Sequence, residues 1–135
     1  MKAKEFLSQA YYMKRQIIAK QKRLDWLRDI VPGPTVTFSD ELKCPSNPKN
    51  SMVENVAIKV VALEEEISAD ILKLLEVTKE IESTIRAIDS LECRTILEMR
   101  YLAFMDWDEI TARMGYARSY IFRLHGKALM QIRVS

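Results

Sequence analysis

Apolar residues recur at alternating spacings of three and four through the middle of the chain, and this pattern restricts the fold more than any other feature. Such heptad spacing is typical of a helix that pairs with another helix in a coiled coil. Ser51, followed by Glu54, predicts a capped start for this helix. We therefore expect one long helix over residues 51–88, much longer than an ordinary globular helix. Its expected seam consists of Val56, Val60, Leu63, Ile67, Ile71, Leu74, Val77, Ile81, Ile85 and Ile88.

The N-terminal segment carries a second heptad pattern, which predicts a helix over residues 3–31. Lys20 interrupts its seam at one position. Pro32 and Pro34 should end the helix, because proline supplies no N–H and restricts the residue before it. Residues 32–50 hold all four prolines of the chain and are predicted to form a loop. The expected seam consists of Ala3, Phe6, Ala10, Met13, Ile17, Leu24, Leu27 and Val31.

Charge is sorted between these two segments. Residues 1–31 carry eight Lys/Arg against three Asp/Glu, a balance of +5, and residues 51–91 carry four against nine, a balance of −5. Opposite charges attract along the flanks of a coiled coil, so we expect an antiparallel helical hairpin in which the basic helix is neutralised by its acidic partner. The same surfaces would also fit a homodimer, and the sequence leaves both arrangements open.

Several classes of protein are not expected. No apolar run reaches the roughly 20 residues of a membrane-spanning helix, and the N-terminus lacks the pattern of a signal peptide. Cys44 and Cys93 stand far apart, with no ligand spacing to His125, the single histidine. We find no phosphate loop and no nucleophile–base pair. The expectation is a cytoplasmic protein that is not an enzyme and has no metal, cofactor or catalytic residue.

The C-terminal part predicts three shorter helices. Asp89 or Ser90 can cap a helix over residues 92–104. Asp106 should cap the next helix, 107–114, with Glu109 at the capping-box position. Gly115 should end that helix, and a last helix is expected over 117–133. Two helices joined by a tight, glycine-containing turn are typical of a helix-turn-helix.

The last helix has two different faces. At about 100° per residue, an apolar side should face the core and a polar side should stay free. Arg118 projects from the first turn of this helix. Elsewhere in the chain, Trp107 and Trp26 are interpreted as packing anchors. Gly126 costs about 1 kcal/mol in mid-helix, which makes sense if another backbone passes closely. The inward residues are Ile121, Leu124, Ala128 and Ile132; the outward ones are Ser119, Arg123, Gly126 and Met130, with Phe122 and Lys127 on the shoulders.

The stretch LECRTILEMRYLAFMDWDEITARMGYARSYIFRLHGKALMQI resembles region four of bacterial sigma factors, which reads the promoter −35 element. The whole chain is similar to small sigma-like transcriptional regulators of phages and mobile elements, of the ArpU and RinA late-gene activator type. The resemblance implies that double-stranded DNA is the partner and that base contacts come from Arg118, Ser119 and Arg123. It places Arg113, Tyr120, Phe122, His125 and Lys127 at flanking positions, some of which meet phosphates.

The chain departs from sigma factors in two ways. Ser119, Tyr120 and Phe122 differ from the usual residues, so the −35 preference is not carried over, and the promoter-melting region has no counterpart. We therefore expect an accessory regulator, and the resemblance implies that helix 92–104 contacts RNA polymerase core. The rival hypotheses are a DNA-packaging adaptor similar to small terminase subunits and a protein-interaction module that has lost DNA binding.

The expected fold is all-α. A helical hairpin, residues 1–88, is followed by a region-four-like helix-turn-helix, residues 89–135. The sequence leaves open the target site, the direction of regulation and the oligomeric state.

Overall fold

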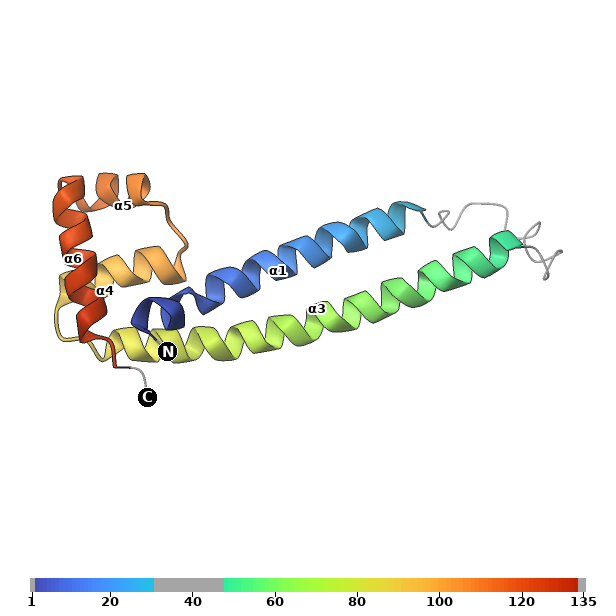
Figure 1. Cartoon of the computed structure of the whole chain (residues 1–135), viewed down its shortest axis with the longest axis horizontal. Helices are drawn as coiled ribbons and strands as arrows, with labels where there is room; N and C mark the ends of the chain where they lie inside the picture. Colours follow the sequence, from blue (N-terminus) through green and yellow to red (C-terminus); the bar gives the residue numbers. More distant parts are fainter. Residues whose placement is uncertain (1, 31–47, 134–135) are drawn as a thin grey trace. The chain divides into compact units, whose positions relative to one another are not determined.

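The structure of the chain is a computed structural model that describes residues 2–30 and 48–133 (Figure 1). Every regular element in these ranges is helical, so the predicted all-α class is confirmed. Within the same ranges, no helix combines the length and the apolar character that a membrane crossing requires. The elements are α1 (Ala3–Ile30), α3 (Pro48–Arg86), α4 (Leu91–Leu97), the π-helical turn η1 (Glu98–Leu102), α5 (Trp107–Met114) and α6 (Arg118–Gln131).

The ends of the two long helices differ from the prediction at one point. α1 ends at Ile30, close to the predicted end, whereas Val31 and the predicted loop up to residue 47 lie outside the described residues. α3 begins at Pro48, so Ser51 lies inside the helix and the capping-box prediction is wrong. Proline suits a first helical turn, because the N–H that it lacks would have no partner within the helix.

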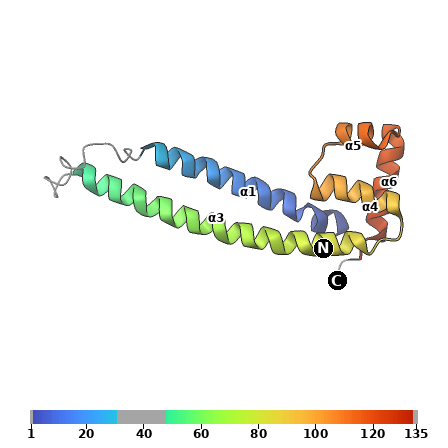
Figure 2. The same ribbon diagram turned by 180° about the vertical axis from the view of Figure 1, so that it is seen from behind.

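The chain divides into two compact units, which are described separately. One unit comprises Arg15–Ile71 and contains parts of α1 and α3. Lys20 Nζ lies 2.6 Å from Asp70 Oδ2, and Arg28 Nη2 lies 3.5 Å from Glu64 Oε1. The residue later in α1, Arg28, pairs with the residue earlier in α3, Glu64. The two helices therefore run antiparallel in this unit (Figure 2). Its buried apolar residues are Ile17, Leu24, Leu63 and Ile67.

One packing-anchor prediction and one seam prediction in this unit are wrong. Trp26 is 62% exposed and is not a packing anchor, because it lies roughly 200° around α1 from the buried Leu24. Ile71 is 39% exposed, and the neighbouring Asp70 faces α1 instead, where it pairs with Lys20. Lys20, which interrupts the seam of α1, is thus paired with Asp70, which takes the place of Ile71 in the seam of α3.

The second unit comprises Met1–Lys14 and Leu72–Ser135 and has one apolar core. Leu7 is fully buried there, although the predicted seam had placed Phe6 at this position. The core takes residues from both sides of the predicted domain boundary after residue 88; that boundary itself stays a prediction. The buried members are Leu7, Ala10, Ile81, Ile85, Ile88, Cys93, Ile96, Leu97, Tyr101, Ile110, Ile121, Leu124 and Ala128.

The predicted helix 92–104 contains a π-helical turn that its sequence pattern does not show. Ser90 is the N-cap, and its Oγ accepts from the Cys93 backbone N–H at 3.3 Å. The Ala103 N–H then donates to the Glu98 carbonyl at 2.9 Å, five residues back. The helix ends at Leu102, and Phe104 adopts a left-handed φ of 58°. This ending places Tyr101 in the core of the unit.

Candidate nucleic-acid interface

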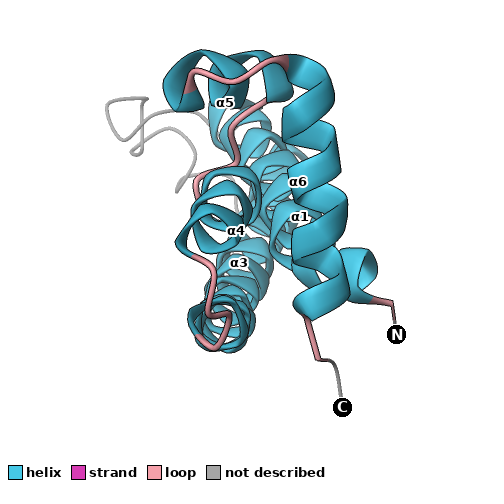
Figure 3. Ribbon diagram, turned by 90° about the vertical axis from the view of Figure 1, so that its left-hand side faces the viewer, coloured by secondary structure: helices cyan, strands magenta, loops and turns pink. Residues whose placement is uncertain are grey.

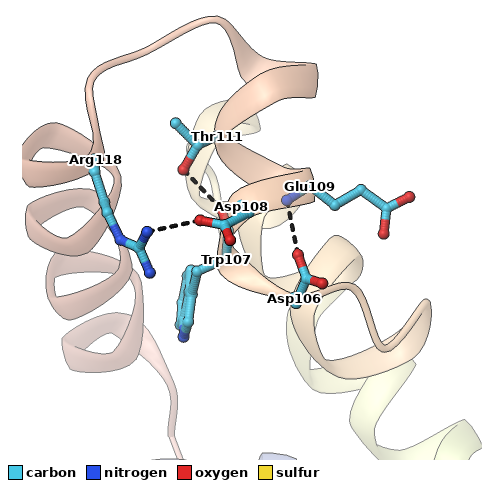
Figure 4. A network of polar contacts seen from close by, with 6 residues as sticks. All are labelled: Asp106, Trp107, Asp108, Glu109, Thr111 and Arg118. Atoms are coloured by element: carbon cyan, nitrogen blue, oxygen red, sulfur yellow. Dashed lines mark hydrogen bonds and ion pairs between the residues drawn. The ribbon is translucent and has the colours of Figure 1, made fainter.

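The turn between α5 and α6 forms as the sequence predicts. The carboxylate of Asp106 accepts from the Glu109 backbone N–H at 2.8 Å and caps α5 (Figure 4). Gly115 ends α5 with a φ of 73°, a left-handed conformation that residues with a Cβ atom rarely adopt. The buried Ile110 holds α5 onto the core. α6 starts at Arg118, one residue after the predicted start, with Ala117 as an N-cap that supplies no side-chain hydrogen bond.

α6 lies beside α4 (Figure 3) and packs on it. Ile121 and Ala128 are fully buried, and Leu124 is almost so. Ile132, predicted to be the fourth inward residue, follows the end of α6 and is only partly buried. The predicted division of this helix into a buried and an exposed side is therefore confirmed for the three residues within it.

The opposite side of α6 is exposed along its length. Ser119, Arg123, Gly126 and Lys127 are all exposed, and Met130 is 88% exposed. A methyl group added at Gly126 would meet no atom of another segment within 4 Å, so nothing in the described chain approaches this backbone. The close approach expected at Gly126 is thus not an internal contact.

Two of the predicted DNA-binding arginines pair with acids on α5. Arg118 Nη1 donates to Asp108 Oδ1 at 2.6 Å (Figure 4). The Arg118 guanidinium also lies 5.5 Å from the centre of the Phe122 ring. Arg113 Nη2 lies 3.6 Å from Glu109 Oε1. Both arginines and Asp108 are more than half exposed, and Glu109 is 46% exposed, so water screens the pairs and each adds little to stability. Arg123 and Lys127 form no ion pair within the described ranges.

The predicted aromatic residues of α6 make contacts within the unit. The Tyr120 hydroxyl donates to Glu92 at 3.2 Å, and the Tyr116 hydroxyl donates to the other oxygen of this carboxylate at 3.0 Å. The Glu92 charge raises the pKa of Tyr120, and the hydrogen bond to Glu92 raises the pKa of Tyr116. Phe122 is 44% exposed and lies edge-on against Trp107, with ring centres 5.1 Å apart.

His125 does not lie on the surface, and its predicted role at a flanking phosphate position is corrected here. The ring is buried: its Nε2 lies 2.7 Å from the Tyr101 hydroxyl, and Trp107 packs edge-on against it at 4.8 Å. Burial, together with the charges of Lys4 and Arg100, lowers the pKa of His125 to about 4. The neutral ring therefore joins α6 to η1 and α5 as part of the core.

The sequence analysis did not identify the contacts that tie α6 to the first turn of α4. No contact was predicted for Glu92, yet it accepts hydrogen bonds from two tyrosines. Glu92 and Tyr120 are 28 residues apart, so no local pattern indicates the contact. Trp107, in contrast, packs against the core as predicted, with the Arg100 guanidinium 4.7 Å from its ring centre.

Comparison with known proteins gives one match. A family described as proteins of unknown function, DUF1492, matches residues 46–133, which include α4, α5 and α6. No curated protein and no solved structure match the chain. Because the family match covers more than half of its residues, the chain belongs to the DUF1492 family.

Proposed function

We propose that this protein binds double-stranded DNA in a sequence-dependent way, with α6 as the helix that enters the major groove. The observation that carries the proposal is the exposed side of α6. It combines Arg123 and Lys127, cations without an acidic partner in the described ranges, with a glycine that nothing covers. Arginine suits base reading because its guanidinium fork can pair with guanine O6 and N7.

The start of α6 supports the same proposal. Ala117 supplies no side-chain cap, so the first backbone N–H groups of α6 remain available to an anion. Ser119 and Arg118 stand in that first turn, where a phosphate would complete their hydrogen bonding. From Arg113 to the C-terminus the sequence carries five basic residues and no acid. Of these five, Arg123 and Lys127 lie on the exposed side of α6 without an ion pair in the described ranges, so DNA phosphates would meet two available cations there.

The proposed biological role follows from the resemblance to sigma region four. We propose a transcriptional regulator of phage or mobile-element type that acts in the bacterial cytoplasm and is an accessory to the host RNA polymerase. α4 and η1 cover the segment that the resemblance assigns to polymerase contact. A pull-down of the full chain with core polymerase tests this part of the proposal separately from DNA binding.

Selection of binding sites from random DNA duplexes at physiological salt tests the function directly. We expect one sequence to be enriched, with a log affinity that falls linearly with log salt. Arg123→Ala should cost about 1–3 kcal/mol and relax the preference at one base position. Lys73→Ala removes the same charge from an exposed site on α3 and is the matched control. Failure to enrich any sequence would overturn the proposal.

A protein-interaction module is the second candidate function. Three observations favour it: Met130 is 88% exposed, Phe122 is 44% exposed, and Arg118 is already paired with Asp108. Such a surface would bind an apolar partner rather than a polyanion. Replacement of Met130 by Ser separates the two, because it should weaken a protein complex and leave DNA affinity within about twofold, since the side chain offers no charge to a phosphate.

A further inference from the structure

α3 carries a second apolar stripe on the side turned away from α1. Ile58, Val61, Leu72 and Leu75 are each between 55% and 67% exposed. Val61 is two residues from the buried Leu63, which places it roughly 200° around the helix from the face that packs on α1. Large apolar side chains exposed in a regular row on one helix are unusual on a monomer and indicate an interaction site.

The stripe has heptad spacing and a symmetric order. Its eight positions are separated by four, three, four, three, four, three and four residues, the spacing of a coiled-coil seam. Read from either end, the order is a charged residue, two apolar residues, two polar residues, two apolar residues and a charged residue. All eight side chains are exposed: Glu54, Ile58, Val61, Glu65, Ser68, Leu72, Leu75 and Lys79.

We propose that this face of α3 binds the same face of a second copy of the chain, in antiparallel register. A two-fold axis between Glu66 and Ile67 of each α3, at the midpoint of the stripe, pairs each position with its mirror position. Ile58 then meets Leu75 of the other copy, and Val61 meets Leu72. A two-fold contact of this kind is self-complementary, as the symmetry of a homodimer requires.

The charges fix the direction of the pairing. In antiparallel register, Glu54 of one copy lies opposite Lys79 of the other at both ends of the seam. In parallel register, Glu54 would meet Glu54 and Lys79 would meet Lys79, and both contacts are repulsive. The seam from Glu54 to Lys79 is about 38 Å long at 1.5 Å per residue.

The middle of the seam is its weakest part. Each Glu65 would lie opposite Ser68 of the other copy, and the serine hydroxyl can donate to the carboxylate. The two Glu65 carboxylates would also lie in adjacent layers and repel each other. We therefore expect a reversible dimer whose population depends on protein concentration.

Sedimentation of the full chain from about 1 to 200 µM, with circular dichroism as a check of folding, tests the interface. We expect a monomer–dimer equilibrium that Leu72→Asp weakens at least tenfold. Glu65→Leu should strengthen it at least tenfold, because it replaces the repulsive layers by apolar ones. Glu80→Leu, an equal change at an exposed site outside the stripe, should leave it within about twofold. A chain that stays monomeric throughout, or a dimer indifferent to Leu72→Asp and Glu65→Leu, overturns the proposal.

The register is tested by charge exchange. Glu54→Lys and Lys79→Glu should each weaken the dimer, and the double variant should recover the original dissociation constant, because each new lysine again meets a glutamate. Disulfide trapping in a Cys44→Ser background gives an independent result. Val61→Cys mixed with Leu72→Cys should form a cross-link between the two variants, whereas Val61→Cys alone should not. Efficient cross-linking of Val61→Cys with itself would overturn the antiparallel register.

Discussion

The guanidinium of Arg118 lies 2.6 Å from the carboxylate of Asp108, which joins the first turn of α6 to the first turn of α5. The sequence analysis assigned Arg118 to a base contact, and in the free protein this side chain has an acidic partner within its own chain. The pair is exposed, at 56% for Arg118 and 83% for Asp108, so exchanging the carboxylate for a phosphate or a base edge costs little. If α6 binds DNA as we propose, Asp108 competes with DNA for the arginine.

Asp108→Asn should increase DNA affinity several-fold. The change removes a negative charge next to the proposed DNA surface and frees the Arg118 guanidinium from its ion pair. In an Arg118→Ala background the same change should bring a smaller gain, since only the charge effect remains. Both effects are measured by fluorescence anisotropy, in which the selected duplex is titrated with the unchanged protein, Asp108→Asn, Arg118→Ala and the double variant.

Glu98→Gln is the control for the Asp108→Asn measurements, because it neutralises an exposed acid on η1, away from α6. It should leave DNA affinity within about twofold. An equal gain from Asp108→Asn with and without Arg118 would show that Arg118 takes no part in binding.

Gly126→Ala should change stability and DNA binding in opposite directions. Nothing in the described chain would contact the added methyl group, so alanine should stabilise α6 by about 0.5–1 kcal/mol through its higher helix propensity. If the backbone of α6 lies close to DNA, the same methyl group should weaken binding at least fivefold. Urea unfolding and duplex titration measure the two effects; unchanged DNA affinity would remove Gly126 from the interface.

His125 should make stability depend on pH. Its folded pKa of about 4 lies below the unfolded value of about 6.5, so the unfolded chain binds more protons between these values. The contribution of the neutral His125 ring to the free energy of unfolding is fully present above pH 6.5. It is lost as the pH falls toward 4, and the loss is about 1 kcal/mol at pH 5.5. Urea unfolding from pH 7.5 to 5 measures this. His125→Gln, which does not titrate, should be less stable at pH 7.5 but should show a flatter profile; an equal slope in both proteins would contradict the assignment.

Lys20 and Asp70 should be replaceable as a pair but not singly. Both side chains are partly buried, and the hydrogen bond to Asp70 raises the pKa of Lys20. Asp70→Ala should lower the unfolding temperature, because it leaves Lys20 on the seam without its closest partner. Lys20→Leu with Asp70→Leu should be at least as stable as the natural protein, since an apolar layer replaces the ion pair. Thermal unfolding of the three proteins is the measurement, and a double variant less stable than Asp70→Ala would contradict it.

Local chemistry in the sequence determined most of the helices. The cap at Asp106 and the left-handed Gly115 act within four residues, so their effects follow from residue types and spacing alone. The buried side of α6 followed from the helical period for the same reason. The prediction for Pro48 was wrong for a local reason as well. We assigned this residue to a loop, although proline is accommodated in the first turn of a helix.

Only the tertiary structure decided which polar side chains stay free. His125 is buried because Tyr101 and Trp107, from other segments, surround it. Glu92 binds two tyrosines more than 20 residues away, and Asp108 takes Arg118 across the turn. The helical period gives the direction in which a side chain leaves its own helix, but the neighbours that it meets come from distant segments. For that reason the sequence predicted correctly that Arg123 lies on the outward side of α6, whereas only packing determined that His125 is buried.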